Sequence, residues 1–328
     1  MKAGTVNPRL AMSRLFAIAL VGTTFGFSAP LQSFGQTAQG PDLSYSYQND
    51  SPAYPAESGP MIVFSARNSV FVRNGSAKPL AKLAESDGFQ TFTSDGTLDD
   101  ALLAKAGILV IINAYDRDQY KNFPAMTPPS AFSDEEIERV RKWVDGGGNL
   151  LVLADHAPLG GGSSKLAEAF GFTFLNGHAA ETKSADAGYS HVILDFRQQT
   201  GLASDTPVTD GSMGRKPTER FFAFGGQAFI PATGAVQLLT IPDGWSAIFS
   251  YRLQDELASA PRIDASGMAQ GAILEYGKGR IGVFGEAGGF TAQISPDGKF
   301  GFNTDEGAQN PEFILSLLRW LAHYQPKG

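Results

Sequence analysis

Polar and titratable side chains follow four apolar runs of this sequence, at the points where each run ends. Carboxylates together with an imidazole are the groups that general acid–base catalysis uses, and they can also hold a single metal ion. The residue types at these run ends therefore suggest a site. The residues concerned are Arg67 and Asn68, then Asn113 and Asp116, then Asp155 and His156, and finally Glu286.

Asp155, His156 and Glu286 are the candidate catalytic residues. In this interpretation His156 is the general base or a metal ligand, Glu286 is its carboxylate partner, and Asp155 orients it. Each residue also has a structural explanation. Asp155 can cap the following turn by accepting backbone N–H bonds, and His156 can be a hydrogen-bonded structural histidine. Glu286 stands between two small residues, and a glutamate buried there needs a polar partner.

A second set of residues is assigned to substrate binding, because they follow predicted strands or lie in loops. Asn113 and Gln293 position the substrate in this interpretation, although Asn and Asp are also common turn formers. His178, in the loop sequence LNGHAAE, is a candidate to line the cleft. The full set is Asn113, Asp116, Arg67, Asn68, His178 and Gln293.

Strand-like and helical patterns alternate along the first part of the chain, and this alternation predicts the sheet that would bring the run ends together. The clearest helix, 133–148, begins with a capping box of Ser133 and Glu136 and ends at three glycines. We expect a doubly wound, mostly parallel sheet in a three-layer sandwich, with ligands bound at the carboxyl ends of the strands. The predicted strands are 61–66, 90–94, 107–115 and 149–155.

The rest of the chain is less regular. Residues 173–270 are interpreted as an elaboration of the same α/β domain, which is expected to span 61–328. The sequence pattern of residues 269–290 predicts a hairpin with its turn at 277–279. A closing helix is expected to begin with Pro311 after a capping Asn310.

Residues 1–35 have the layout of a secretory signal peptide. Three basic residues precede an apolar run from Leu15 to Phe27, which is too short to span a membrane, and cleavage is expected near Gly35. Residues 36–60, rich in Pro, Ser, Tyr, Gln and Gly, are expected to form an extended arm. We therefore expect a secreted or periplasmic protein without a transmembrane segment after signal cleavage.

The charge and the missing residue types exclude several functions. Removal of residues 1–35 leaves 23 Lys and Arg against 33 Asp and Glu, a net charge of −10 with His neutral. An acidic surface repels phosphate backbones, so nucleic acid is not expected as a partner. The chain has no cysteine, which excludes disulfides, thiolate metal sites and a cysteine nucleophile. It also has no G-x-S-x-G nucleophile elbow and no H-E-x-x-H zinc motif.

Most of residues 48–324 resemble a family of exported bacterial proteins of unknown function. The stretches that carry the resemblance include PSAFSDEEIERVRKWVDGGGNLLVLADHAPLGG, AFGGQAFIP and QGAILEYGKGRIGVFGEAGGFTAQI. The resemblance implies a domain similar to the class I glutamine amidotransferase-like, flavodoxin-like fold. Where such amidotransferases carry a catalytic cysteine, this chain has Asp155-His156, and its late strand end holds Glu286 without a histidine. Glutaminase chemistry through a thioester is therefore excluded.

This chain also departs from the family that it resembles. The family usually has an Asp-Glu-Ala-His type motif after the first strand, and this sequence has Ser65-Ala66-Arg67 there. Two hypotheses follow. The protein binds a small-molecule or carbohydrate-type ligand at the strand ends without catalysis, or it is a hydrolase or lyase that uses His156, Glu286 and Asp155. The residue spacing selects no cofactor, no metal and no oligomeric state.

Overall fold

The computed structural model describes residues 39–115, 129–250 and 257–326, which all belong to one compact unit, Gln36–Gly328. The predicted signal peptide at 1–35 and the candidate residue Asp116 lie outside the described residues. Among the described helices, none has the length and apolar character that a membrane span requires.

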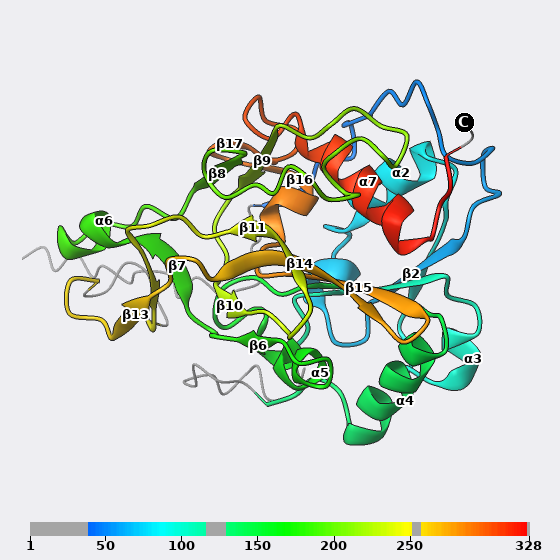
Figure 1. Ribbon diagram of the computed structural model, residues 1–328, viewed down its shortest axis with the longest axis horizontal. Helices are drawn as coiled ribbons and strands as arrows, with labels where there is room; N and C mark the ends of the chain where they lie inside the picture. Colours follow the sequence, from blue (N-terminus) through cyan, green and yellow to red (C-terminus); the bar gives the residue numbers. More distant parts are fainter. Residues whose placement is uncertain (1–38, 116–128, 251–256, 327–328) are drawn as a thin grey trace, which may run out of the picture. The chain divides into compact units, whose positions relative to one another are not determined.

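Five parallel strands form one half of a nine-stranded sheet (Figure 1). The apolar sequences of the two central strands are buried along their whole length, as parallel strands covered on both faces require. Ile112 and Phe284 both pair with Leu153, so three of the strands end level at one edge of the sheet. In sheet order the strands are β3 (Gln90–Ser94), β2 (Met61–Ser65), β4 (Ile108–Ile112), β5 (Asn149–Leu153) and β15 (Gly279–Phe284).

The other half of the sheet is antiparallel, so the predicted doubly wound, mostly parallel, three-layer sandwich of flavodoxin-like or amidotransferase-like type is wrong. Of the eight strand pairings in this sheet, four are parallel and four are antiparallel. The change of direction occurs at the predicted hairpin, where Tyr276 pairs with Gly279, because a tight turn can join only antiparallel strands. The antiparallel strands are β14 (Ala269–Tyr276), β10 (Phe229–Ile230), β6 (Thr173–Phe174) and β11 (Val236–Thr240).

In the part of the chain that the structure describes, three smaller antiparallel sheets accompany the large one. The expected arm at 36–60 contributes one strand to the first of them, and residues 173–270 contribute every strand of the other two. The first contains β1 (Gly40–Pro41), β16 (Ala292–Ser295) and β17 (Gly298–Gly301); the second contains β7 (His178–Glu181), β12 (Trp245–Ile248) and β13 (Arg262–Asp264); the third contains β8 (Leu194–Arg197) and β9 (Arg220–Ala223).

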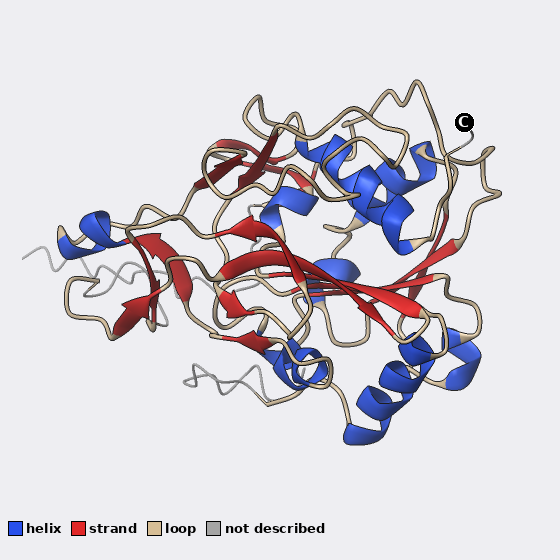
Figure 2. Ribbon diagram, viewed as in Figure 1, coloured by secondary structure: helices blue, strands red, loops and turns tan. Residues whose placement is uncertain are grey.

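Helices lie on both sides of the nine-stranded sheet (Figure 2). The described helices are α1 (Val70–Arg73), α2 (Lys78–Ser86), α3 (Asp100–Leu103), α4 (Asp134–Asp145), α5 (Ser164–Glu168), α6 (Thr182–Asp186) and α7 (Asn310–Leu321). Alternate residues of β2 point to opposite sides of the sheet. Ile62 and Phe64 therefore join a core cluster with α2 and α7, whereas Val63 joins a cluster with α3, α4 and α5.

Two helix starts test the sequence predictions. The capping box of α4 is confirmed, since Ser133 accepts from the backbone of Glu136 and the Glu136 side chain accepts from the backbone of Ser133. The predicted cap of α7 is wrong, because the cap position is Gln309. The amide of Asn310 bonds instead with the backbone of Phe222 and Gly289, which joins α7 to β9 and to the turn after β15.

A buried ion pair connects the arm with two helices. The Arg319 guanidinium of α7 donates to both carboxylate oxygens of Asp87, which caps α2, over 2.7 and 2.5 Å. Both side chains are at most 1% exposed. The same guanidinium donates to the carbonyl oxygens of Ser51 in the arm and of Met213 and Gly214 in a loop. The N–H groups of the Arg319 guanidinium thus join chain segments that lie far apart in the sequence.

Candidate functional site

The carboxyl edge of the parallel strands brings Asn113, Asp155, His156 and Glu286 to the same region, as the apolar runs predicted. Asn113 has a positive φ of 44°, and its Oδ1 accepts the backbone N–H of Asp155 over 2.9 Å. Asp155 in turn accepts the backbone N–H of His156 over 2.8 Å through Oδ1. Asn113 and Asp155 therefore hold the backbone of the turn after β5, and the second carboxylate oxygen of Asp155 has no hydrogen bond to a described residue.

His156 and His178 form a stacked pair, with ring centroids 4.4 Å apart and ring planes at 26°. Nδ1 of His156 lies 2.8 Å from the carbonyl oxygen of Ala157. A carbonyl can only accept, so Nδ1 carries the proton and Nε2 of the neutral ring is an acceptor. Sequence reasoning placed His178 in a loop as a candidate to line the cleft; it opens β7 and contacts the strand-edge histidine.

His178 is held neutral. Burial and, after it, the neighbouring His156 lower the pKa of His178 to about 2. A hydrogen bond to the backbone of Ser250 raises this pKa, but its effect is the smallest of the three. Its Nε2 is buried and has no hydrogen-bond partner among the described residues. The lone pair of this Nε2 can accept a hydrogen bond from a ligand. Such a bond would be favourable, because a buried polar atom without a partner costs free energy.

Glu286 is the buried carboxyl of the edge, with 1% of its surface exposed. Its Oε1 accepts the backbone N–H groups of Gly289 over 2.7 Å and of Phe224 over 3.3 Å. Its Oε2 is buried without a partner in the described part of the chain. Burial, and after it the charge of Asp155, raise the pKa of Glu286 to about 8, so the carboxyl carries a proton at neutral pH.

The loop between β9 and β10 joins these groups, and sequence reasoning did not assign it to the site. A side chain at Gly225 would meet the His156 ring at 3.9 Å, and one at Gly226 would lie 3.0 Å from Glu286 Oε2. Gln227 donates to the carbonyl oxygens of Ala154 and Asp155 over 2.8 and 2.9 Å. The sequence AFGGQAFIP was part of the family resemblance, and its paired glycines and glutamine were the available signal.

Gln270 of β14 is the second residue that sequence reasoning missed. It is fully buried, and its Nε2 donates to the carbonyl oxygen of Gly225 over 2.9 Å. Its Oε1 has no hydrogen-bond partner among the residues described. Because β14 belongs to the antiparallel half, a search confined to the ends of parallel strands could not find it.

Three predicted binding residues are used elsewhere. Arg67 pairs with Glu136 of α4 over 2.8 Å, and Asn68 donates to the carbonyl oxygen of Ala131, so both attach the start of α4 to the sheet edge. Gln293 lies in β16, where it pairs with Pro41 of β1. Its carbonyl oxygen accepts from Asn303, away from the strand edge. Asp116 lies outside the described residues.

The catalytic arrangement expected from the sequence requires a contact between His156 and Glu286. No hydrogen bond or ion pair joins these two side chains in the described structure, and Asp155 bonds to the backbone rather than to the imidazole ring. Across residues 39–115, 129–250 and 257–326, no three His, Asp or Glu side chains converge closely enough to hold a metal ion. What the edge does contain is a set of acceptors beside a protonated carboxyl.

The raised pKa of Glu286 gives a pH dependence of stability. Between pH 6.5 and 8 the native state keeps a proton on Glu286 that the unfolded state, with the ordinary value of 4.5, has released. The free energy of unfolding should therefore fall by about 1–2 kcal/mol as the pH rises through this window, and then level off. His178 is neutral in both states over most of this range. Urea unfolding at pH 6.5, 7.25 and 8 measures the effect.

Glu286→Gln is the variant for this prediction, since glutamine keeps the shape but does not ionise. Between pH 6.5 and 8, the free energy of unfolding of this variant should change by less than about half of the change in the wild type. Glu168→Gln, at an exposed position of α5, is the matched control and should behave as the wild type. Equal slopes for the wild type and Glu286→Gln would show that Glu286 is already ionised at pH 6.5.

Comparisons with known proteins place the chain among structures with little sequence similarity. No protein-family model matches this sequence, and no curated protein matches it either. Among solved structures, it is similar to the mmIFT52 N-terminal domain, with 18% identity, 80% of this chain and 97% of that chain covered, and a TM-score of 0.48. A cytoplasmic protein from Salmonella typhimurium matches with 12% identity, 80% and 98% coverage, and a TM-score of 0.49.

A third similar structure is a protein described as ThuA-like, from Bacteroides uniformis ATCC 8492. The two sequences are 10% identical, and the match covers 84% of this chain and 94% of the ThuA-like protein, with a TM-score of 0.47. Similarity at this level carries no functional argument, so the site must be interpreted from its own residues.

Proposed function

We propose that this protein binds a small polyhydroxylated compound of carbohydrate type at the carboxyl edge of its parallel strands. The observation that carries the proposal is a group of acceptor atoms there that have no hydrogen-bond partner among the described residues. They are Nε2 of His156, Nε2 of His178, one carboxylate oxygen of Asp155 and Oε1 of Gln270. Hydroxyl groups supply donors for such acceptors, and the proton of Glu286 supplies one donor in return.

The charge of the edge supports the same ligand class. At neutral pH the buried imidazole of His178 is uncharged in this proposal, Glu286 is protonated, and the negative charge of Asp155 acts on Glu286. An anionic ligand would be repelled by Asp155, whereas a neutral polyol is not. The partly exposed ring of His156, stacked on the buried His178, also offers a flat face to the C–H face of a sugar.

A thermal-shift and calorimetry panel tests the proposal on the full chain. The panel holds neutral mono- and disaccharides, sugar acids and amino sugars. We expect a neutral sugar to raise the melting temperature of the wild type by mass action. Asp155→Asn and His156→Gln should each weaken its binding at least about tenfold, the typical cost of losing a hydrogen bond with a charged or buried partner.

His191→Gln is the matched control, because this histidine is half exposed and pairs with Glu181 on β7 rather than with the strand edge. It should bind the sugar as the wild type does. If no sugar shifts the melting temperature, or if the three variants bind equally well, the strand edge is not a carbohydrate site.

A second candidate function is acid–base cleavage of the bound compound, a hydrolase or lyase activity. It is favoured by one observation, the different protonation of two neighbouring carboxyls: Glu286 holds its proton at neutral pH while the charge of Asp155 acts on it. Glu286 would donate a proton and Asp155 or His156 would accept one. Product analysis of the best-binding sugar after long incubation separates the two functions, since a binding protein returns it unchanged.

The cellular setting also belongs to this proposal. The N-terminal pattern of residues 1–35 suggests export, so the ligand would be met in the periplasm or outside the cell. Membership of the exported family of unknown function stays a prediction from the quoted stretches. A glutaminase reaction is no part of it, since the chain has no cysteine.

A further inference from the structure

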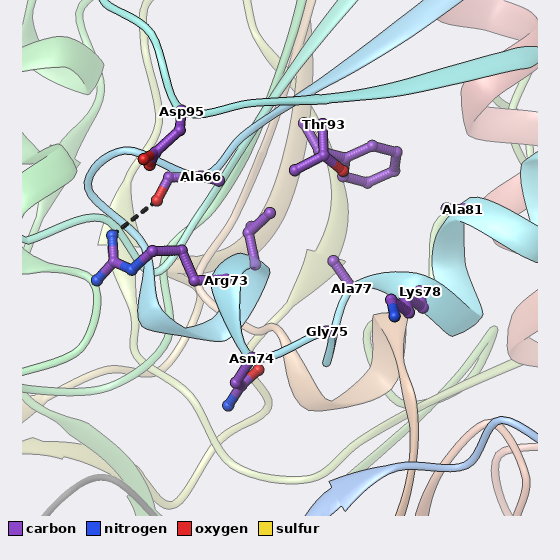
Figure 3. Close-up of a pocket in the computed structure, with 11 residues that line it drawn as sticks. Ala66, Arg73, Asn74, Gly75, Ala77, Lys78, Ala81, Thr93 and Asp95 are labelled. Carbon is purple, nitrogen blue, oxygen red and sulfur yellow. Dashed lines mark hydrogen bonds between the residues drawn. The ribbon is translucent and has the colours of Figure 1, made fainter.

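A pocket lies at the other end of the parallel edge, between β2, β3 and the connection from α1 to α2. It has a volume of about 490 Å³, which is within the range of small-ligand pockets. Its residues include none of the four side chains Asp155, His156, His178 and Glu286. Figure 3 shows the pocket with its labelled side chains.

The pocket has an apolar floor. Phe64 and Ala66 of the β2 end, Val72 of α1, and Ala77 before α2 line it and are at most 6% exposed. Ala81 of α2 completes the apolar side. A floor of this kind favours an aliphatic or aromatic ligand group, because their contact removes apolar surface of both from water.

The rim carries charges of both signs. In Figure 3, Arg73 and Asp95 lie at one end of the pocket and Lys78 lies at the other. Arg73 is fixed, since it donates to the carbonyl oxygens of Ala66 and Arg67 over 2.8 and 2.6 Å. Within the described residues, no hydrogen bond or ion pair holds the side chain of Asp95 or of Lys78, so both charges are free to meet a ligand.

We infer that this pocket binds an unblocked short peptide or amino acid with an apolar side chain. The ligand carboxylate lies at Lys78, its ammonium group at Asp95, and its side chain on the apolar floor. A zwitterion uses the free charges of both ends, whereas a plain carboxylate would leave Asp95 unpaired and a plain amine would leave Lys78 unpaired. A dipeptide covers more of the apolar floor than a single amino acid does, which favours the dipeptide.

Calorimetry on the full chain with four probes tests this inference: leucine, leucyl-leucine, its N-acetyl derivative and its C-terminal amide. We expect leucyl-leucine to bind best, and each blocked form to bind at least about tenfold more weakly, because each lacks one charge-assisted contact. Asp95→Asn should weaken leucyl-leucine but not the N-acetyl form. Lys78→Met should weaken leucyl-leucine but not the amide.

Two further variants complete the design. Ala81→Leu, at a helical position that accepts leucine readily, fills the pocket and should abolish binding of leucyl-leucine. Lys105→Met, at an exposed lysine outside the pocket, should leave it unchanged. Absence of binding, equal binding of the blocked forms, or full binding to Ala81→Leu would each overturn the inference. None of these three results bears on the sugar site, whose residues are different.

Discussion

Arg319→Met is expected to lower the free energy of unfolding by about 3–5 kcal/mol, the usual cost of removing one partner of a buried ion pair. The substitution leaves the Asp87 carboxylate buried with Arg215, 3.8 Å away, as its remaining positive partner, and Asp87 is fully inaccessible to solvent. It also releases the carbonyl oxygens of Ser51, Met213 and Gly214. Urea unfolding followed by circular dichroism measures the change.

Arg197→Met is the matched control for this prediction. Arg197 pairs with Asp195 over 3.1 Å, but half of its side chain is exposed, so its loss should cost less than about 1 kcal/mol. The double variant Arg319→Met with Asp87→Leu removes both charges and should be more stable than Arg319→Met alone, because no unpaired charge remains. If Arg319→Met unfolds within 1 kcal/mol of the wild type, the pair does not hold the arm and helices together.

Gly226→Ala is expected to cost about 2–4 kcal/mol and to abolish sugar binding. Gly226 has a φ of 97°, where a side chain adds strain, and a β-carbon would lie 2.2 Å from the carbonyl oxygen of Gly285. That carbonyl is part of the backbone, so the turn that holds Glu286 must move. The same change displaces Glu286 Oε2, which lies 3.0 Å from the added atom.

Gly234→Ala separates the two causes of this loss. Its φ of 84° is similarly unfavourable, but no atom lies within 4 Å of the added β-carbon. It should therefore cost only the backbone term of about 1–2 kcal/mol and leave sugar binding intact. Denaturant unfolding and calorimetry on both variants give the comparison. Equal losses for the two glycines would mean that the close approach at Gly226 plays no part.

The residues of the strand edge could be predicted because parallel strands have a strong local signal. The buried runs that end before Asn113 and Asp155 are continuous and apolar, and parallel strands place their carboxyl ends together. Asp155, His156 and Glu286 therefore lie at the same edge of the sheet. The same signal does not tell what each side chain contacts. Asp155 bonds to backbone, and His156 stacks on His178 rather than bonding to Glu286.

The antiparallel half could not be predicted, because its strands are short and pair with distant segments. Phe229 pairs with Phe174 and with Ala269, across 55 and 40 residues of chain respectively. Two-residue strands such as β6 and β10 carry no alternation that a sequence pattern can detect. Gln227 and Gln270 reach the site through this half, so they were missed together with the sheet's mixed direction.

The state of the histidines at the strand edge tests the central claim most directly. The chain has four histidines, so long-range ¹H–¹⁵N spectra can assign each imidazole through single substitutions. The account predicts that His178 stays neutral down to pH 4, and that His156 carries its proton on Nδ1. It also predicts that the best-binding sugar shifts the signals of these two rings and leaves His191 and His323 unchanged. A His178 that titrates near pH 6.5, or a sugar that moves neither ring, would contradict the proposed site.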